Sequence, residues 1–166
     1  MGCVAGAGAC ADSPTYRLAS LQSPLAYHAM AELSPIASVV LDIPVKTYDV
    51  DFAQIVHNAV YIRWLEDLRT ALMERHCPLA NWMQRDLMPV LLETHIRYRR
   101  AIRLFEAVRG EMHLLRFGPV RWELGASFSV AGEKRAEATQ VGCFISLHTH
   151  RAVPIPADLR RMFQPA

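Results

Sequence analysis

The sequence predicts an α+β fold in which one long helix packs against an antiparallel sheet. Apolar residues at steps of three and four, typical of an amphipathic helix, follow residue 58. From residue 88 the chain consists instead of alternating segments of strand length, divided by turn residues. Because these strands follow the helix one after another, we expect them to pair antiparallel.

The first expected element is a strand at 39–47, where β-branched residues recur. Pro44 favours an edge position for it, because proline cannot donate a hydrogen bond to a neighbouring strand. The helix comes next, and Pro78 ends it by disfavouring a helical residue before it. The apolar face of this helix carries Tyr61, Trp64, Leu65, Leu68 and Leu72.

Four more strands are expected, at 90–102, 104–117, 120–130 and 136–148. The third of them has the clearest pattern, with apolar side chains at its even-numbered positions and mostly polar or small ones between. Residues 79–87 are interpreted as a linker or a short helical turn. A short final helix is expected at 157–163, after Pro156.

The composition is that of one globular domain, with 166 residues, 52% hydrophobic and 20% charged. A net charge of +2 is too small to indicate nucleic-acid binding. The sequence has no charge-free apolar run of about 18 residues, so no membrane span is predicted. Residues 1–35 differ from the rest of the chain and begin with a small, apolar run at 1–10, and we expect a flexible N-terminal extension there, with a single domain at 36–166.

Cysteines lie at positions 3, 10, 77 and 143, without a C-x-x-C pair or a metal-ligand spacing. We interpret them as free thiols in a reducing compartment, which predicts a cytoplasmic protein. His148 and His150 would share a face of a strand. Because no further ligands lie near them in the sequence, we interpret them as an exposed strand end and predict no metal.

Asp51 lies between the end of the first strand and the start of the helix. A helix start has backbone N–H groups without partners inside the helix and a partial positive charge, so it can polarise a carbonyl oxygen. Asn58 is a candidate N-cap, and Asp51 can face the same carbonyl carbon as a nucleophile or base. Spacing alone leaves open that Asp49 and Asp51 only cap a turn.

A longer motif surrounds Asp51. It reads Asp51-x-x-x-Ile55-Val56-x-Asn58-x-x-Tyr61 and continues as Trp64-Leu65-Glu66-Asp67-Leu68-Arg69. This pattern resembles the signature of hotdog-fold acyl-CoA thioesterases of the 4-hydroxybenzoyl-CoA thioesterase type. Residues 151–160 are similar to the closing strand and last helix of that family, and the likeness covers 38–163. It implies a sheet of about five strands wrapped around one long helix, with a short C-terminal helix.

One position departs from the family pattern. The family has glycine three residues after the catalytic aspartate, and Gln54 stands there in this chain. Glutamine does not take a positive φ cheaply. We therefore expect the turn to differ locally and Gln54 to reach into the site.

The resemblance implies hydrolysis of acyl-CoA thioesters, with Asp51 as nucleophile or general base. The backbone N–H groups around Asn58 and Ala59 would hold the oxyanion, and the Asn58 amide would orient water or the carbonyl. His57 either lines the pocket or is an ordinary turn residue. Tyr61 either packs in the core or touches the acyl group.

Charged residues near the motif have two interpretations. Arg97, Arg99 and Arg100 can bind the phosphates of CoA through their guanidinium groups, or they are scattered surface arginines. Glu66 and Asp67 are near enough to act as a base, but a solvated helix face fits them better. No cofactor beyond the CoA of the substrate is predicted.

The predicted sheet leaves an edge exposed, and pairing between copies would cover it. The resemblance implies a homodimer in which two sheets join edge to edge, or a dimer of dimers, with active sites at the dimer interface. The alternative function is a non-catalytic acyl-CoA-binding hotdog module, which would be expected to lack the acid at position 51. A hotdog hydratase ranks third, because the chain lacks the histidine context expected of that class.

Overall fold

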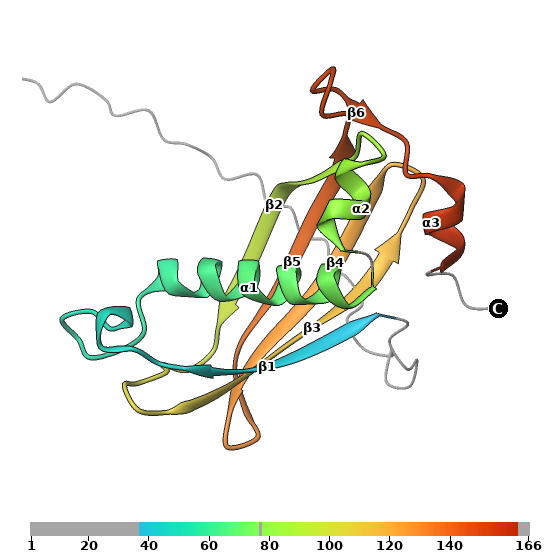
Figure 1. Cartoon of the computed structure of the whole chain (residues 1–166). Helices are drawn as coiled ribbons and strands as arrows, with labels where there is room; N and C mark the ends of the chain where they lie inside the picture. Colours follow the sequence, from blue (N-terminus) through green and yellow to red (C-terminus); the bar gives the residue numbers. More distant parts are fainter. Residues whose placement is uncertain (1–36, 77, 163–166) are drawn as a thin grey trace, which may run out of the picture. The chain divides into compact units, whose positions relative to one another are not determined.

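The computed structural model describes residues 37–76 and 78–162. The predicted extension at 1–35 therefore lies outside the described residues. The elements (Figure 1) are β1 Ser38–Pro44, the 3₁₀ helix η1 Thr47–Asp49, α1 Asn58–His76, α2 Leu79–Met83, β2 Met88–Tyr98, β3 Ala107–Phe117, β4 Arg121–Val130, β5 Glu133–Ile145, β6 Ala152–Val153 and α3 Ala157–Met162.

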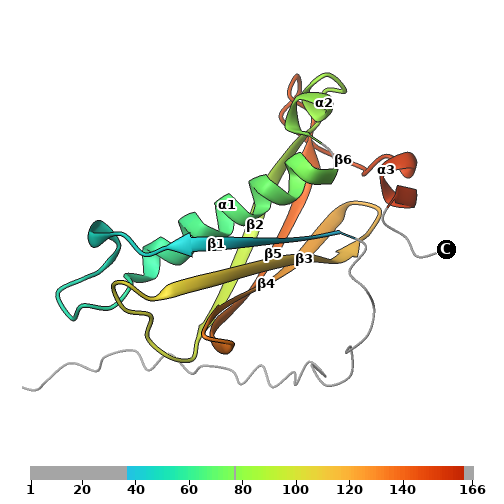
Figure 2. The ribbon, with the colours of Figure 1, turned by 60° about the horizontal axis from the view of Figure 1, so that its bottom comes forward.

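The strands form one antiparallel sheet in the order β1-β3-β4-β5-β2, with the short β6 paired to β5. Helix α1 lies across one face of this sheet (Figure 2). The α+β hotdog arrangement is thus confirmed. The first strand is shorter than predicted, because it ends at Pro44 and η1 takes up residues 47–49.

The core lies between α1 and the sheet. Alternate side chains of β4 face the helix and are buried, as the period of two predicts: Trp122, Leu124, Ala126, Phe128 and Val130. Phe128 is fully buried, with its ring 5.6 Å from those of both Tyr61 and Trp64. These contacts fix the first turns of α1 on the sheet.

Strand β2 is an edge of the described sheet, since it pairs only with β5. It is mostly exposed along its length, and its exposed residues include the apolar Leu91 and Leu92. The pairing shifts by one residue between Leu91 and Glu93, which marks a bulge. None of the described helices is long and apolar enough to cross a membrane.

Candidate functional site

A small hairpin between η1 and α1 carries Asp51. Val50 pairs with Val56, and the backbone N–H of Asp51 donates to the carbonyl of Ile55 at 2.9 Å. The N–H of Val56 donates to the carbonyl of Ile102 at 2.8 Å, which fastens the hairpin to the segment after β2. The position of Asp51 is therefore set by backbone pairing on both sides of it.

The Asp51 carboxylate caps its own turn. Its Oδ1 accepts hydrogen bonds from the backbone N–H groups of Ala53 at 2.8 Å and Ile55 at 3.4 Å. Its Oδ2 accepts no hydrogen bond from any described residue, and the side chain is partly exposed. The turn-capping interpretation is therefore correct for Oδ1, while Oδ2 has no hydrogen-bond partner among the described residues.

Gln54 holds the conformation that suits glycine. Its φ is 60°, and its N–H donates to the carbonyl of Asp51 at 2.9 Å. Gln54 therefore adopts the left-handed conformation itself, and the reason for expecting a local change of the turn does not hold. The exposed Gln54 side chain makes no hydrogen bond with the described residues.

We expect Gln54→Gly to raise the free energy of unfolding by about 0.5–1 kcal/mol. Glycine removes the steric cost of the left-handed conformation, which is about 1–2 kcal/mol. Part of this gain is lost, because glycine gives the unfolded chain more conformational entropy than glutamine does. Urea unfolding monitored by fluorescence measures the change, and Gln54→Ala serves as the control without gain. A less stable glycine variant would show that the glutamine side chain itself stabilises the turn.

His57 caps the start of α1. Its Nδ1 accepts a hydrogen bond from the N–H of Ala59 at 3.0 Å, and its carbonyl accepts one from Val60 at 2.9 Å. The helix itself begins at Asn58. The prediction of Asn58 as N-cap is therefore wrong by one residue. The Ala59 N–H that was expected to hold an oxyanion is occupied by the imidazole, whereas the Asn58 N–H makes no hydrogen bond within the described residues.

Tyr98 was missed by the sequence analysis. It is the last residue of β2, and its hydroxyl donates to the carbonyl of Asn58 at 3.5 Å. Its ring meets that of Tyr61 edge to face, with centroids 5.0 Å apart. Its contact with the helix start follows from the fold, because the end of β2 lies beside Asn58. No local sequence pattern predicts this contact.

Tyr61 is a core residue, buried at 2% exposure. Burial, helped by Tyr98 and Glu106, raises its pKa from 10.0 to about 12. Between pH 10 and 12 the unfolded state therefore binds fewer protons than the folded state at this residue. Of the two interpretations of Tyr61, packing in the core is the one that the contacts support.

We expect the stability of the protein to fall by about 1.4 kcal/mol per pH unit from this residue between pH 10 and 12. The loss arises because a raised pKa in the folded state favours the protonated form, and unfolding then becomes easier as pH rises. Urea unfolding at several pH values measures it. The slope of Tyr61→Phe over the same range should be smaller, and equal slopes would contradict the shift.

Asp49 holds the hairpin to the helix. The side chain is 5% exposed, its Oδ2 accepts from the N–H of Lys46 at 2.9 Å, and its Oδ1 accepts from Arg63 at 2.8 Å. Its carbonyl accepts from the N–H of His57 at 2.9 Å. Asp49 therefore has the structural role that spacing alone allowed for it, and it ties η1, the hairpin and α1 together.

A double-mutant cycle of Asp49→Asn and Arg63→Met should show a coupling free energy of about 1–2 kcal/mol, because removing Arg63 alone leaves a buried carboxylate with little compensation. The control is the exposed pair Arg85–Asp158, at 3.0 Å. There the coupling should be clearly smaller, because both side chains are solvated. Equal couplings in the two cycles, measured by urea unfolding, would contradict the role of Asp49.

The three predicted arginines are exposed and lie at the same end of the sheet as the hairpin. Arg99 contacts Glu137 at 2.6 Å, Arg97 approaches the same carboxylate at 3.9 Å, and Arg100 pairs with Glu133. Glu66 and Asp67 are exposed on α1, which fits the solvated face. Among residues 37–76 and 78–162, no group of three His, Cys, Asp or Glu side chains could hold a metal.

The sequence model of the Thioesterase-like superfamily matches residues 45–163. The chain belongs to this superfamily. The match covers the hairpin, α1 and the whole sheet after β1, and it supports thioester hydrolase activity. The resemblance to hotdog thioesterases is therefore confirmed. No curated protein matches the chain by sequence.

Solved hotdog structures superpose on the thioesterase-like domain. The probable thioesterase YbaW from Escherichia coli is 21% identical, with a TM-score of 0.67 over 76% of this chain and 95% of its own. The 1,4-dihydroxy-2-naphthoyl-CoA thioesterase Slr0204 from Synechocystis is 15% identical, with a TM-score of 0.67 over 76% and 95%. A thioesterase from Thermus thermophilus, solved with coenzyme A and Zn, is 22% identical, with a TM-score of 0.65 over 78% and 92%.

Proposed function

We propose that the protein hydrolyses acyl-CoA thioesters and that Asp51 is its nucleophile or general base. The observation that carries the proposal is the Asp51 carboxylate, which the hairpin holds by Oδ1 while Oδ2 makes no hydrogen bond within the described residues. A carboxylate fixed in this way can be placed against a thioester without a cost in side-chain entropy. The thioesterase of Thermus thermophilus that was solved with coenzyme A supports CoA as the thiol of the substrate.

In the general-base route, Asp51 takes a proton from water as the water oxygen attacks the thioester carbonyl. The carbonyl oxygen becomes an oxyanion, which the Asn58 N–H and the positive end of α1 stabilise. A single donor of this kind contributes about 3–4 kcal/mol in other enzymes. The C–S bond then breaks, the thiolate of CoA leaves and takes up a proton, and the acid is released. In the nucleophilic route, Asp51 attacks first and water hydrolyses the mixed anhydride.

The remaining predicted residues fit around this centre. His57 must move off the Ala59 N–H if Ala59 is to be a second oxyanion donor, and the Asn58 amide is exposed where water would enter. Gln54 is exposed on the turn beside Asp51. At least one of Arg97, Arg99 and Arg100 would exchange its glutamate for a CoA phosphate, because exposed ion pairs contribute little to stability and a guanidinium can bind phosphate bidentately.

We further propose that the protein works as a homodimer, or as a dimer of dimers, joined through β2. The exposed Leu91 and Leu92 support this interface, as does the edge of β2 that pairs with no other described strand. The buried thiol of Cys143 is free, which fits the cytoplasm that the cysteine pattern predicts.

The proposal is tested by measuring CoA thiol release from a panel of aromatic, short-chain and long-chain acyl-CoA thioesters, in the presence of thiol-reactive dye. Hydrolysis of at least one member, at a rate proportional to enzyme concentration, is the expected result. If the protein binds acyl-CoA in calorimetry and hydrolyses none of the panel, the non-catalytic binding module replaces the enzyme. Light scattering at micromolar concentration tests the dimer, and a strict monomer would overturn the interface.

A further inference from the structure

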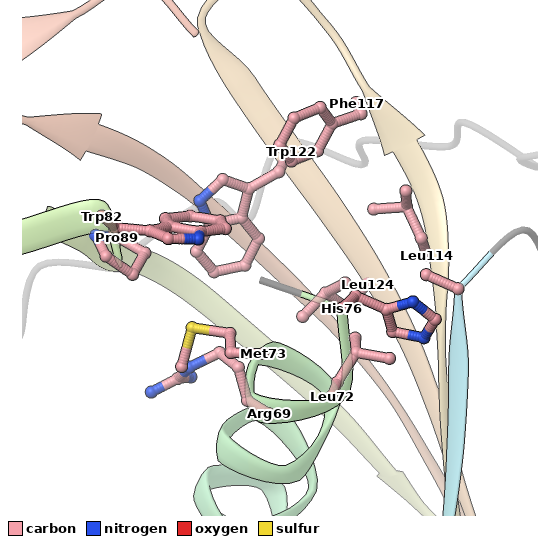
Figure 3. A pocket seen from close by; sticks show the side chains of 11 residues that line it. Arg69, Leu72, Met73, His76, Trp82, Pro89, Leu114, Phe117, Trp122 and Leu124 are labelled. Carbon is pink, nitrogen blue, oxygen red and sulfur yellow. The ribbon is translucent and has the colours of Figure 1, made fainter. Parts of the chain in front are cut away.

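An apolar cavity lies at the C-terminal end of α1, far from Asp51. Its volume is about 60 Å³, and it is partly open. Figure 3 shows the last turns of α1 facing side chains from α2 and from the ends of the strands. Its wall is formed mainly by Leu72, Met73, Trp82, Leu114, Trp122 and Leu124.

The two tryptophans of this wall are held rigidly. The indole of Trp122 lies over Gly142, which has no room for a Cβ beneath the ring, and its Nε1 donates to the carbonyl of Cys143 at 3.3 Å. The ring of Trp82 packs against Phe144, with centroids 4.5 Å apart. The cavity is thus a preformed shape and not a gap that the core would close.

Two side chains in the wall, Arg69 and His76, carry ionisable groups, and Arg69 has partners already. Its Nη1 donates to Oε1 of the buried Gln140 at 3.1 Å, and its Nη2 pairs with Glu66. Because the guanidinium is satisfied and the wall residues other than Arg69 and His76 are apolar, the cavity suits a hydrocarbon group.

The cavity does not serve the Asp51 of its own chain. Helix α1 has 19 residues and is therefore about 28 Å long, with Asp51 near its start and the cavity at its end. Beneath the helix, Leu65 and Leu68 are both 0% exposed and fill the space between the two points. An acyl group attached at Asp51 has no path along the buried face of α1.

Pairing of two β2 strands brings a second Asp51 close. Pro89, near the start of β2, lines the cavity, and Tyr98, at its end, contacts the first residue of α1. If two copies pair antiparallel about a two-fold axis, the Pro89 end of one β2 lies beside the Tyr98 end of the other. The cavity of one chain then adjoins the helix start of its partner.

We propose that this cavity receives the apolar tail of the acyl group whose thioester is bound at the partner's Asp51. The inference rests on the proposed thioesterase function and adds a substrate class, acyl groups with a hydrocarbon or aromatic end that reaches beyond the reacting carbonyl. Trp82 and Trp122 determine the shape of tail that fits. Acetyl-CoA has no tail beyond its methyl group, whereas decanoyl-CoA carries eight more carbons that the cavity is proposed to receive.

The first test fills the cavity with Met73→Trp and compares it with Glu74→Trp, which adds the same ring at an exposed position of the same helix turn. For decanoyl-CoA, kcat/KM should fall about tenfold or more in Met73→Trp and stay unchanged in Glu74→Trp. Acetyl-CoA hydrolysis should be equal in both. Leu114→Phe is a second filling variant if Met73→Trp melts early. Equal loss on both substrates, or no loss, overturns the cavity assignment.

The second test asks which chain supplies the cavity. Asp51→Asn and Met73→Trp chains, carrying different tags, are co-expressed and the mixed dimer is purified. In the mixed dimer, one chain has an intact cavity and the other an intact Asp51. These two form a complete site only if each active site combines Asp51 of one chain with the cavity of the other. Decanoyl-CoA hydrolysis should therefore recover to about half that of the wild type, while each parent dimer stays low. No recovery would place the cavity with the Asp51 of its own chain.

Failure of the inference and failure of the proposed function are separable. If the wild type hydrolyses none of the panel, the thioesterase proposal fails. The cavity is then tested by calorimetry alone, in which decanoyl-CoA should bind more tightly than acetyl-CoA and Met73→Trp should remove the difference. If the wild type is active and Met73→Trp leaves its chain-length preference unchanged, the function stands and the cavity assignment falls.

Discussion

Asp51→Asn should lower kcat for acyl-CoA hydrolysis by about 10²–10⁴-fold, because an amide can neither accept a proton from water nor attack a thioester at neutral pH. The fold should be preserved. The asparagine Oδ1 can still accept the hydrogen bonds that Ala53 and Ile55 now donate to the carboxylate. The measurement is CoA thiol release under saturating substrate, together with urea unfolding of both proteins.

The matched control is Glu74→Gln, which removes one exposed carboxylate from α1 without touching the hairpin. It should keep the activity of the wild type. An Asp51→Asn protein with full activity and unchanged KM would remove Asp51 from the mechanism. A variant that loses activity and also unfolds early would show instead that the carboxylate serves the turn.

Much of the fold was predictable because local pattern and burial agree. In β4 every second residue is apolar, and those are the side chains that pack against α1. The boundaries were less predictable where turns compete with strands. Pro44 ends β1 and lets Thr47–Asp49 coil into a 3₁₀ turn, although the β-branched residues Val45 and Thr47 suggested a longer strand.

The site was predictable only in part. The motif placed Asp51 before the helix, but it did not show that His57, rather than Asn58, caps α1. Histidine is not a favoured N-cap, so propensity favours the wrong residue. Tyr98 lies forty positions from Asn58, and only the closing of β2 against the helix start joins them. Such contacts depend on the topology of the sheet, which no local pattern contains.

Gln54 shows the opposite case, where a correct rule led to a wrong expectation. A positive φ is costly for glutamine, so we expected the turn to change. Gln54 nevertheless takes a positive φ of 60°, because the pairs Val50–Val56 and Ile55–Arg103 fix the backbone on both sides. Strain of about 1–2 kcal/mol is tolerated when the surrounding hydrogen bonds determine the conformation.

Phe128→Ala should reduce the free energy of unfolding by about 3–5 kcal/mol, since the ring is fully buried and its removal leaves a cavity in the core. Its loss also removes the support of Tyr61 and Trp64, whose rings both lie 5.6 Å away. Urea unfolding measures the effect against Phe105→Ala, which removes an 88% exposed ring and should change stability by less than about 0.5 kcal/mol. Domains are stable by only about 5–15 kcal/mol, so this loss is a large share of the total. In the Phe128→Ala variant we therefore expect the start of α1 to open locally, and hydrolysis to fall, at urea concentrations below those that unfold the whole domain. A loss below about 2 kcal/mol would mean that the helix start, and with it the oxyanion site, is held mainly by the hairpin and not by the sheet.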